Sequence, residues 1–365
     1  MSDHDNPALR LDPDMALREP DGSICWYDLA GLELEGMGWR ETEGPYERLP
    51  SRAAGAVPEA VWTLGKHSAG ICARFATDAP GISCRWTLKK KSLAMDHMPA
   101  TGVSGLDLYV RHEGEWRWLG VGRPDKSPTN QRELVGGMEP GRREYLLYLP
   151  LYNGVSEVLL GLPPEARLER LPPRPAERAK PVVFYGTSIV QGGCASRPGM
   201  AYPAILGRRL DVPTVNLGFS GNGRMEPEVV GFVAGIDAAA FVIDCMPNVQ
   251  EPQVTERTEP LVAALRAAHP GTPIVLVESV TYQDGFLVAS RRSRYETSNR
   301  ALRAAYERMI AASVAGLHYV RGKELFGPDG EATVDGVHAT DLGFLRIADV
   351  LGPVLDKVLG LRRSQ

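Results

Sequence analysis

The sequence lacks the apolar run of roughly 18 residues that a membrane-spanning helix needs. Its opening residues, Met-Ser-Asp-His-Asp-Asn-Pro, are polar and acidic. A secretory signal would instead begin with a positive region followed by an apolar core. These two absences predict a cytoplasmic protein that neither crosses nor binds a membrane.

Cysteine is scarce, and charge of one sign does not accumulate. The 365 residues include five cysteines, no two of them at Cys-x-x-Cys spacing. A chain of this length can bury a stable core without covalent cross-links, so no disulfide framework is predicted. Lysine and arginine total 41 against 45 acidic residues, a formal net charge of −4 with the two signs interleaved. Without a basic stripe, the sequence argues against nucleic-acid binding.

The hydrophobic pattern differs between the two halves of the sequence and indicates two domains. A chain of this length also favours two domains. From about residue 20 to 160, short apolar segments alternate with polar residues and turns, which is typical of strands. These segments are 71–76, 82–88, 105–110, 115–119, 145–149 and 157–160. We expect a hairpin around Gly114 and another across Tyr152-Asn153-Gly154. Such short strands predict a β-sandwich, jelly-roll-like in type.

A proline-rich stretch separates this part from the rest. Residues 161–181 contain six prolines among charged residues, which favours extended backbone over helix or ladder. Helical stretches such as 254–268 and 292–312 then alternate with apolar runs. The runs are 181–185, 213–217, 239–244, 273–277 and 317–320. Together they predict an α/β domain over 176–365, with a parallel sheet covered on both faces, after a β-sandwich domain over 1–175.

Sites in open α/β sheets lie beyond the carboxyl ends of the strands. The first predicted strand ends in Tyr185-Gly-Thr-Ser188, which would place a serine in a tight strand-to-helix turn. Ser188 by itself fits a nucleophile or a helix N-cap. A phosphate-binding loop is disfavoured, because the Gly-x-x-x-x-Gly-Lys-Ser pattern is absent.

The next two strand ends offer hydrogen-bond donors. Gly221 follows Asn216-Leu-Gly-Phe-Ser, and glycine lets a backbone N–H approach a ligand closely. A dinucleotide-binding loop is the competing interpretation, but its Gly-x-Gly-x-x-Gly spacing is not met. Asn248, beyond the third strand, fits an oxyanion donor or an ordinary turn residue.

The last strand end is followed by Asp335-Gly-Val-His338, ahead of a helix expected from about Asp341. This spacing lets the carboxylate reach one ring nitrogen and leaves the other free as a general base. No second histidine or cysteine stands nearby at ligand spacing, so we expect no metal, and the chemistry requires no organic cofactor.

Four short segments thus carry the candidate residues: Ser188 in the first block, Gly221 in the second, Asn248 in the third, and Asp335 with His338 in the fourth. Taken together, these four blocks resemble the SGNH (GDSL-like) hydrolase superfamily over roughly residues 178–360. The resemblance implies a flavodoxin-like, three-layer α/β fold. It assigns Ser188 as the nucleophile, with Asp335 and His338 completing a catalytic triad. It also assigns an oxyanion hole to the N–H groups of Ser188 and Gly221 and the side-chain amide of Asn248.

The sequence departs from the family pattern beside these residues. Thr187 stands where the family usually has aspartate, which makes Thr187 a candidate pocket residue. Met246 and Val249 replace the glycine and aspartate that usually flank the asparagine of the third block. Further upstream, Gly105-Leu-Asp-Leu-Tyr109 is similar to the Gly-x-Asp-Leu-Tyr element of a β-sandwich domain that precedes some SGNH esterases.

The resemblance implies a carboxylester hydrolase that removes small acyl groups, often acetyl groups on carbohydrates, through an acyl-enzyme. A lysophospholipase or thioesterase of the same superfamily stays open, as does a homo-oligomer. The alternative of another class is a nucleotide- or glycan-binding module in which the serine only caps a helix.

Residues 92–104 join two predicted strands and are longer than the ~2–5 residues of most hairpin loops. This segment carries His97 and Met98, a polar and apolar mixture that is unusual for a solvated loop. We expect His97 and Met98 to wall the acyl pocket, with a mobile, solvent-facing loop as the alternative.

Overall fold

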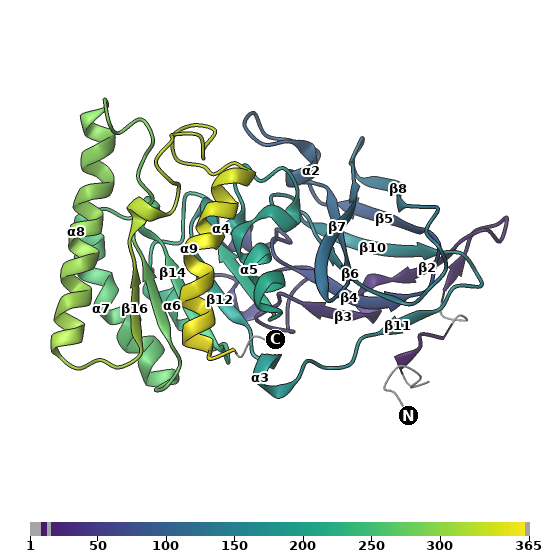
Figure 1. Ribbon diagram of the computed structural model, residues 1–365, viewed down its shortest axis with the longest axis horizontal. Coiled ribbons are helices and arrows are strands. Elements are labelled where there is room, and N and C mark those ends of the chain that lie inside the picture. The colour runs from purple at the N-terminus through teal and green to yellow at the C-terminus, as the bar shows by residue number, and fades with distance from the viewer. Residues whose placement is uncertain (1–8, 13–15, 362–365) are drawn as a thin grey trace.

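Two antiparallel sheets enclose one apolar core in the N-terminal half of the computed structural model, which describes residues 9–12 and 16–361 (Figure 1). One sheet has the order β1-β2-β10-β5-β8, and the other has the order β11-β4-β9-β6-β7 with β3 beside β4. Their bounds are β1 Leu17–Arg18, β2 Cys25–Asp28, β3 Glu33–Glu35, β4 Cys72–Thr77, β5 Ile82–Leu88, β6 Leu106–His112, β7 Glu115–Gly122, β8 Thr129–Val135, β9 Arg143–Tyr148, β10 Val155–Leu162 and β11 Leu168–Arg170. The predicted β-sandwich is confirmed. The opening segment, for which no signal is predicted, lies outside the described residues.

Local pairing in this half follows the prediction at one turn and departs from it at another. β6 and β7 form the expected hairpin around Gly114. The hairpin predicted across Tyr152-Asn153-Gly154 is wrong, because β9 pairs with β4 and β6 while β10 pairs with β2 and β5. The connection crosses between the two sheets, and the buried Asn153 side chain bonds the backbone of Lys90 and the hydroxyl of Ser104.

The proline-rich stretch of residues 161–181 contains some regular secondary structure. β11 lies between its prolines and pairs with β4, and a short helix, α3 (Ala176–Ala179), follows. The ladder forms because residues 165–171 contain no proline, so their N–H groups stay available. The expectation of no ladder in this stretch is therefore wrong.

Five parallel strands form the sheet of the C-terminal half in the order β13-β12-β14-β15-β16. Their bounds are β12 Val182–Gly186, β13 Thr214–Gly218, β14 Ala240–Asp244, β15 Ile274–Val277 and β16 Leu317–Val320. This is the flavodoxin-like order, and its switch point lies between β12 and β14. The predicted α/β fold is confirmed.

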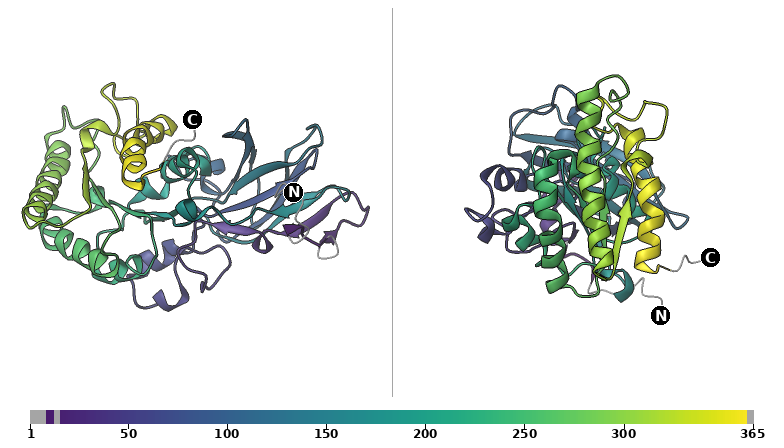
Figure 2. Two further views of the ribbon diagram at one scale, coloured as in Figure 1. Left: turned by 60° about the horizontal axis from the view of Figure 1, so that its bottom comes forward. Right: turned by 90° about the vertical axis from the view of Figure 1, so that its left-hand side faces the viewer.

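Helices cover both faces of this sheet (Figure 2). One face carries α4 (Ser188–Gln191), α5 (Tyr202–Leu210) and α9 (Asp341–Leu359). The other carries α6 (Pro227–Val233), α7 (Glu251–Ala268) and α8 (Ala289–Ala311), of which α7 and α8 match the predicted helices. In the described part of the chain, no helix is long and apolar enough to cross a membrane.

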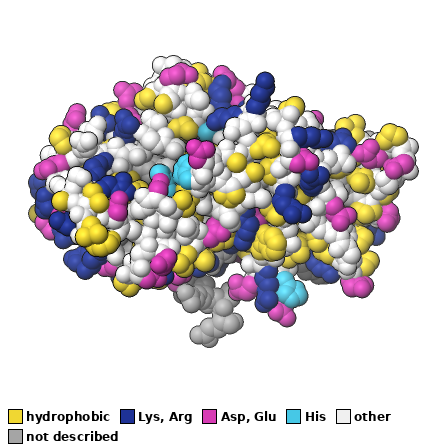
Figure 3. Space-filling view, turned by 90° about the horizontal axis from the view of Figure 1, so that it is seen from above, with side chains coloured by type: hydrophobic (Ala, Val, Ile, Leu, Met, Phe, Trp, Pro, Cys, Tyr) yellow, Lys and Arg dark blue, Asp and Glu magenta, His cyan; other side chains and the backbone are white. Residues whose placement is uncertain are grey.

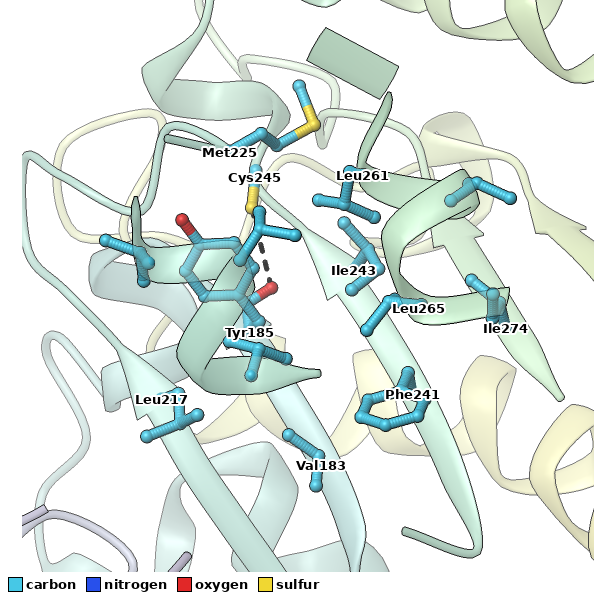
Figure 4. Packing of buried hydrophobic residues seen from close by; sticks show 14 of the residues in the cluster. Val183, Tyr185, Leu217, Met225, Phe241, Ile243, Cys245, Leu261, Leu265 and Ile274 are labelled. Atoms are coloured by element: carbon cyan, nitrogen blue, oxygen red, sulfur yellow. Dashed lines mark hydrogen bonds between the residues drawn. The ribbon is translucent and has the colours of Figure 1, made fainter. Parts of the chain in front are cut away.

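The apolar strands supply the core under α7. Figure 4 shows Tyr185, Phe241 and Ile243 packed with leucines of that helix, and the Cys245 thiol donating to the carbonyl of Tyr185 at 3.6 Å. Trp62, on the unpredicted helix α1 (Glu59–Gly65), belongs to the same core. The N-terminal half therefore completes the packing of the parallel sheet. All five cysteines are buried and unpaired.

Candidate active site

The carboxyl ends of the parallel strands point to the upper edge of the molecule in Figure 1, where Ser188 begins α4 directly after β12. Its side chain is largely buried, with 7% of its surface exposed. Thr187 is fully buried, and its hydroxyl accepts a hydrogen bond from the N–H of Ile189 at 3.3 Å. Thr187 is thus the N-cap, and it has no exposed surface for a substrate to contact.

Ser188, His338 and Asp335 form a chain of hydrogen bonds. Ser188 Oγ lies 2.9 Å from His338 Nε2, and His338 Nδ1 lies 2.7 Å from Asp335 Oδ2. A carboxylate can only accept, so Nδ1 carries the proton and Nε2 is left to accept from the serine hydroxyl. The structure brings together three side chains that are up to 150 positions apart in the sequence.

Asp335 is held in its ionised form. Burial by itself raises the pKa of this carboxyl, but hydrogen bonds from the His338 backbone and ring and from the Val337 N–H outweigh it and lower the pKa to about 2. A fixed negative charge therefore faces Nδ1 throughout the neutral range. This is the arrangement that stabilises an imidazolium when Nε2 takes a proton.

Gln283, before α8, and Arg291, in its first turn, support the turn that carries Asp335. Gln283 donates its N–H to the carbonyl of Gly336 at 2.9 Å and accepts at Oε1 from the Thr333 hydroxyl at 2.5 Å. Arg291, on α8, donates to the Asp335 carbonyl at 3.2 Å. Sequence reasoning missed these supports, since each is a common polar residue without a motif.

The loop after β13 passes directly across the end of β12. The N–H of Phe219 donates to the carbonyl of Gly186 at 2.9 Å, and a Cβ on Gly223 would lie only 2.0 Å from the same oxygen. Gly221 has a φ of +68°, in the left-handed region that favours glycine. Asn248, at the end of a short turn after β14, donates its side-chain amide to the carbonyl of Asn222. The two predicted donor positions therefore lie on loops that contact each other.

The segment 92–104 packs against the C-terminal half. The His97 ring stands edge-on to that of His338, with the centroids 5.6 Å apart, and Met98 is buried in the apolar cluster that includes residues of α4 and α5. Thr101, on the unpredicted helix α2 (Ala100–Val103), donates to the carbonyl of Ser196 at 2.6 Å. Figure 3, which looks down on this edge, shows histidine side chains where the two halves meet.

A buried network of Arg48 and His67 from the N-terminal half and Gln191 at the end of α4 supports the loop of Gly221. Arg48 donates to the carbonyls of Asn216 and Gly218 at 3.0 and 2.7 Å. Gln191 accepts from the N–H of Ser220 at 3.0 Å and donates to His67 Nδ1 at 2.9 Å. Sequence reasoning missed Arg48, His67 and Gln191, because nothing in one sequence marks a polar residue as buried.

Burial decides the protonation of this network. It lowers the pKa of Arg48 to about 9, which leaves the guanidinium charged at neutral pH. Burial, together with the nearby Lys90 ammonium, lowers the pKa of His67 to about 2, so its imidazole is neutral. A neutral ring can accept from Gln191 at Nδ1, whereas a doubly protonated ring could not.

The Gly-x-Asp-Leu-Tyr element joins the two halves at another point. Asp107, on β6, has no exposed surface and accepts from Arg197 Nη1 and from the N–H of Gly199, both at 2.8 Å. Trp118 donates its ring N–H to the same carboxylate at 3.0 Å. Burial raises the pKa of Asp107, and the Arg197 cation opposes that rise.

Among the residues that the structure describes, no group of three or more histidine, cysteine, aspartate or glutamate side chains is placed to hold a metal ion.

Two family models match the chain. Residues 179–356 match the GDSL-like lipase/acylhydrolase family, and residues 24–168 match the GxDLY N-terminal domain of SGNH-hydrolase-type esterases. A Bacteroides ovatus protein, whose crystal structure is described as that of a GDSL-like lipase, is 35% identical. The alignment covers 93% of this chain and 99% of that one, with a TM-score of 0.87. This chain belongs to the GDSL-like lipase/acylhydrolase family.

More distant solved structures share the fold of this family member. A salicylyl-acyltransferase from a tetracycline biosynthetic pathway is 20% identical over 98% of this chain and 100% of its own, with a TM-score of 0.72. A family two carbohydrate esterase from Clostridium thermocellum is 14% identical over 80% and 93%, with a TM-score of 0.59. No curated protein matches the sequence.

Proposed function

We propose that this GDSL-family member is a serine carboxylester hydrolase that cleaves short acyl esters, acetyl esters foremost, from carbohydrates. The observation that carries the proposal is the hydrogen-bonded chain from Ser188 Oγ through the His338 ring to Asp335. Such a chain activates a hydroxyl that is otherwise a weak nucleophile.

The reaction has two steps. His338 Nε2 takes the proton of Ser188 Oγ–H as the oxygen attacks the ester carbonyl, and then gives it to the departing alcohol. The acyl group stays on Ser188 until water, deprotonated by the same nitrogen, attacks it and releases the carboxylic acid. Asp335 stays ionised throughout and holds the ring in the tautomer that each transfer needs.

The tetrahedral oxyanion would be bound by the N–H groups of Ser188 and Gly221 and by the Asn248 amide. In residues 9–12 and 16–361, neither of these two N–H groups donates to another group of the chain, so both can serve a ligand. The first N–H groups of a helix have no acceptor within the helix, which explains the free donor at Ser188. Donors placed in advance at the developing charge are typically a large part of such catalysis.

Two further observations favour a small acyl group on a sugar. His97 stands beside His338 and limits the room on that side of the ring. Carbohydrate esterases also share this two-part fold, which supports the carbohydrate as the alcohol component.

One feature favours a longer acyl chain as a second candidate. Phe286 and Leu287 are 75% and 78% exposed on the loop between β15 and α8, close in the chain to Gln283, which contacts the Asp335 turn. An apolar loop tip of this kind suits a long-chain ester. Turnover of 4-nitrophenyl esters from acetate to decanoate separates the two candidates, because a lysophospholipase-type enzyme would prefer the longest chains.

A fluorophosphonate probe tests the proposal directly. We expect one label per chain, on Ser188, and loss of both labelling and ester hydrolysis in Ser188→Ala. Ser220→Ala, a serine on the neighbouring loop, is the matched control and should keep the label. Labelling at Ser220, or full activity in Ser188→Ala, would refute the assignment, and a binding module would show neither label nor turnover.

A further inference from the structure

A polar cavity of about 370 Å³ lies beside Asn248, lined by Arg224, Asn248, Gln250, Pro252, Gln253 and Arg294. Arg224 donates from Nε and Nη2 to the carbonyl of Gly221 at 3.1 and 2.7 Å. Arg294 donates to the carbonyls of Pro247 and Val249 at 3.0 and 2.7 Å. The cavity is therefore built on the loops of the proposed oxyanion donors, and its two arginines flank Gly221 and Asn248.

The lining offers hydrogen-bond donors almost without acceptors. Gln250 and Gln253 form a capping box at the start of α7, in which each side-chain oxygen accepts from the backbone N–H of the other residue. Their amide nitrogens stay available as donors. Arg224 Nη1 and Arg294 Nε also donate to no group of the described chain. A ligand in this cavity must consequently bring acceptor atoms.

The charge of the cavity points to an anion. In residues 9–12 and 16–361, no carboxylate lies within 4.0 Å of either guanidinium of this cavity. Three acids lie close along the chain. Glu226 accepts from the backbone N–H of Arg224 and from the Tyr185 hydroxyl, and in the described chain neither Glu251 nor Glu296 forms an ion pair with Arg224 or Arg294. Two cations thus share one cavity without a counter-ion, and a carboxylate fits the planar donor fork of arginine best.

We propose that this cavity binds a carboxylate on the alcohol component of the substrate, so that the enzyme prefers acyl esters of acidic sugars to esters of neutral sugars. The proposal rests on the proposed esterase function and adds the substrate class to it. Arg224 and Arg294 discriminate between substrates, while Ser188, His338 and Asp335 carry out the bond cleavage.

The test compares two substrates that differ by one carboxylate, mono-O-acetyl galacturonate and mono-O-acetyl galactose. Because a charge-assisted hydrogen bond contributes about 1.5–3 kcal/mol, we expect kcat/KM to favour the acidic ester by roughly ten- to a hundred-fold. Arg224→Gln/Arg294→Gln should bring the ratio close to unity. Arg308→Gln, also on α8 but paired with Glu259 at the surface, is the matched control and should leave the ratio unchanged.

Salt gives a second measure that needs no variant. Ionic attraction is screened as the Debye length falls from about 30 Å at 0.01 M to about 3 Å at 1 M. The preference of the wild-type enzyme for the acidic ester should therefore fall as NaCl rises over that range. If the double variant does not fold, the salt dependence of the wild-type enzyme decides whether the cavity binds the carboxylate. Equal kcat/KM for the two esters at low salt, or a preference that survives in a folded double variant, overturns the proposal.

Binding of the free sugar separates the failure of this proposal from the failure of the esterase assignment. In Ser188→Ala, calorimetry should show galacturonate binding with a one-to-one stoichiometry and galactose binding at least ten-fold more weakly. If neither ester is hydrolysed, the esterase assignment fails, and this measurement alone decides the anion site. Equal binding of the two sugars, or undiminished galacturonate binding in the variant that also carries both arginine substitutions, overturns it.

Discussion

The ring of His97 meets the ring of His338 edge-on, at an interplanar angle of 68°. His97 belongs to the N-terminal half, whereas His338 is the general base that we propose for the C-terminal half. Met98, the next residue, is 2% exposed and belongs to the apolar cluster that also contains residues of α4, α5 and α9. Ser92, Ala94, Asp96 and Pro99 face solvent, whereas His97 and Met98 turn inward, and through them the segment can influence which acyl groups fit.

Removing the His97 ring should relax the acyl-length preference. We expect His97→Ala to raise kcat/KM for 4-nitrophenyl butyrate relative to acetate by roughly ten-fold. The reason is that two added methylenes can contribute about 0.8 kcal/mol each once they have room to be buried. His112→Ala, on the exposed end of β6, is the matched control. An unchanged butyrate-to-acetate ratio in His97→Ala would show that the ring does not limit the pocket.

Loss of the Asn248 amide should affect turnover far more than stability. Removal of one oxyanion donor typically costs about a hundred- to a thousand-fold in kcat, and Asn248→Ala should fall in that range. The hydrogen bond to the Asn222 carbonyl is lost as well, which costs about 1 kcal/mol in the free energy of unfolding. Kinetics and urea denaturation measure the two effects. A large loss of stability with only a small fall in kcat would indicate that Asn248 is an ordinary turn residue and not an oxyanion donor.

Gln191 is expected to act by positioning the loop of Gly221. Gln191→Met keeps the side-chain volume but leaves the Ser220 N–H without its acceptor. We expect kcat to fall about ten- to a hundred-fold while KM changes less than about three-fold. Gln191→Glu keeps the acceptor for the Ser220 N–H but loses the donor to His67 Nδ1 and the Leu151 carbonyl, so it should restore the activity only in part. Parallel losses of activity and melting temperature in both variants would indicate a structural role only.

Asp244 should make stability depend on pH. Burial raises the pKa of this carboxyl to about 7, although the Tyr202 hydroxyl donates to Oδ2 and opposes that rise. Its other oxygen, Oδ1, is buried without a partner in the described part of the chain. The native state therefore keeps a proton that the unfolded chain releases near pH 4. The resulting stability is complete below pH 4 and is lost as pH rises to about 7.

Asp244→Asn removes this titration. Relative to the wild-type protein, the variant should gain free energy of unfolding between pH 4 and pH 7, by about 1.4 kcal/mol for each unit of pKa shift. Urea unfolding at several pH values measures the difference. Asp237→Asn, a surface residue paired with Lys180, serves as the control. Parallel stability curves for Asp244→Asn and the wild-type protein would contradict the expectation.

The sequence predicts the backbone of the site better than its surroundings. The strand end at Ser188 could be located because periodicity fixes the parallel strands, and the turn of Asp335 and His338 because its local Asp-x-x-His spacing marks it. The hairpin predicted between β9 and β10 is wrong, because a turn signal cannot tell pairing within one sheet from a crossing between two. Arg48 could not be found, since its function depends on carbonyls roughly 170 positions away.

The contact of Asp107 with Arg197 and Gly199 constrains how the two halves can be recombined. The carboxylate lies in the segment that matches one family model, and its donors lie in the segment that matches the other. Loss of Arg197 would leave the fully buried Asp107 carboxylate without its cation, whereas the Arg197 side chain is 22% exposed. A chimera that exchanges the N-terminal half between relatives therefore keeps this contact only if Asp107, Arg197 and Gly199 are all preserved.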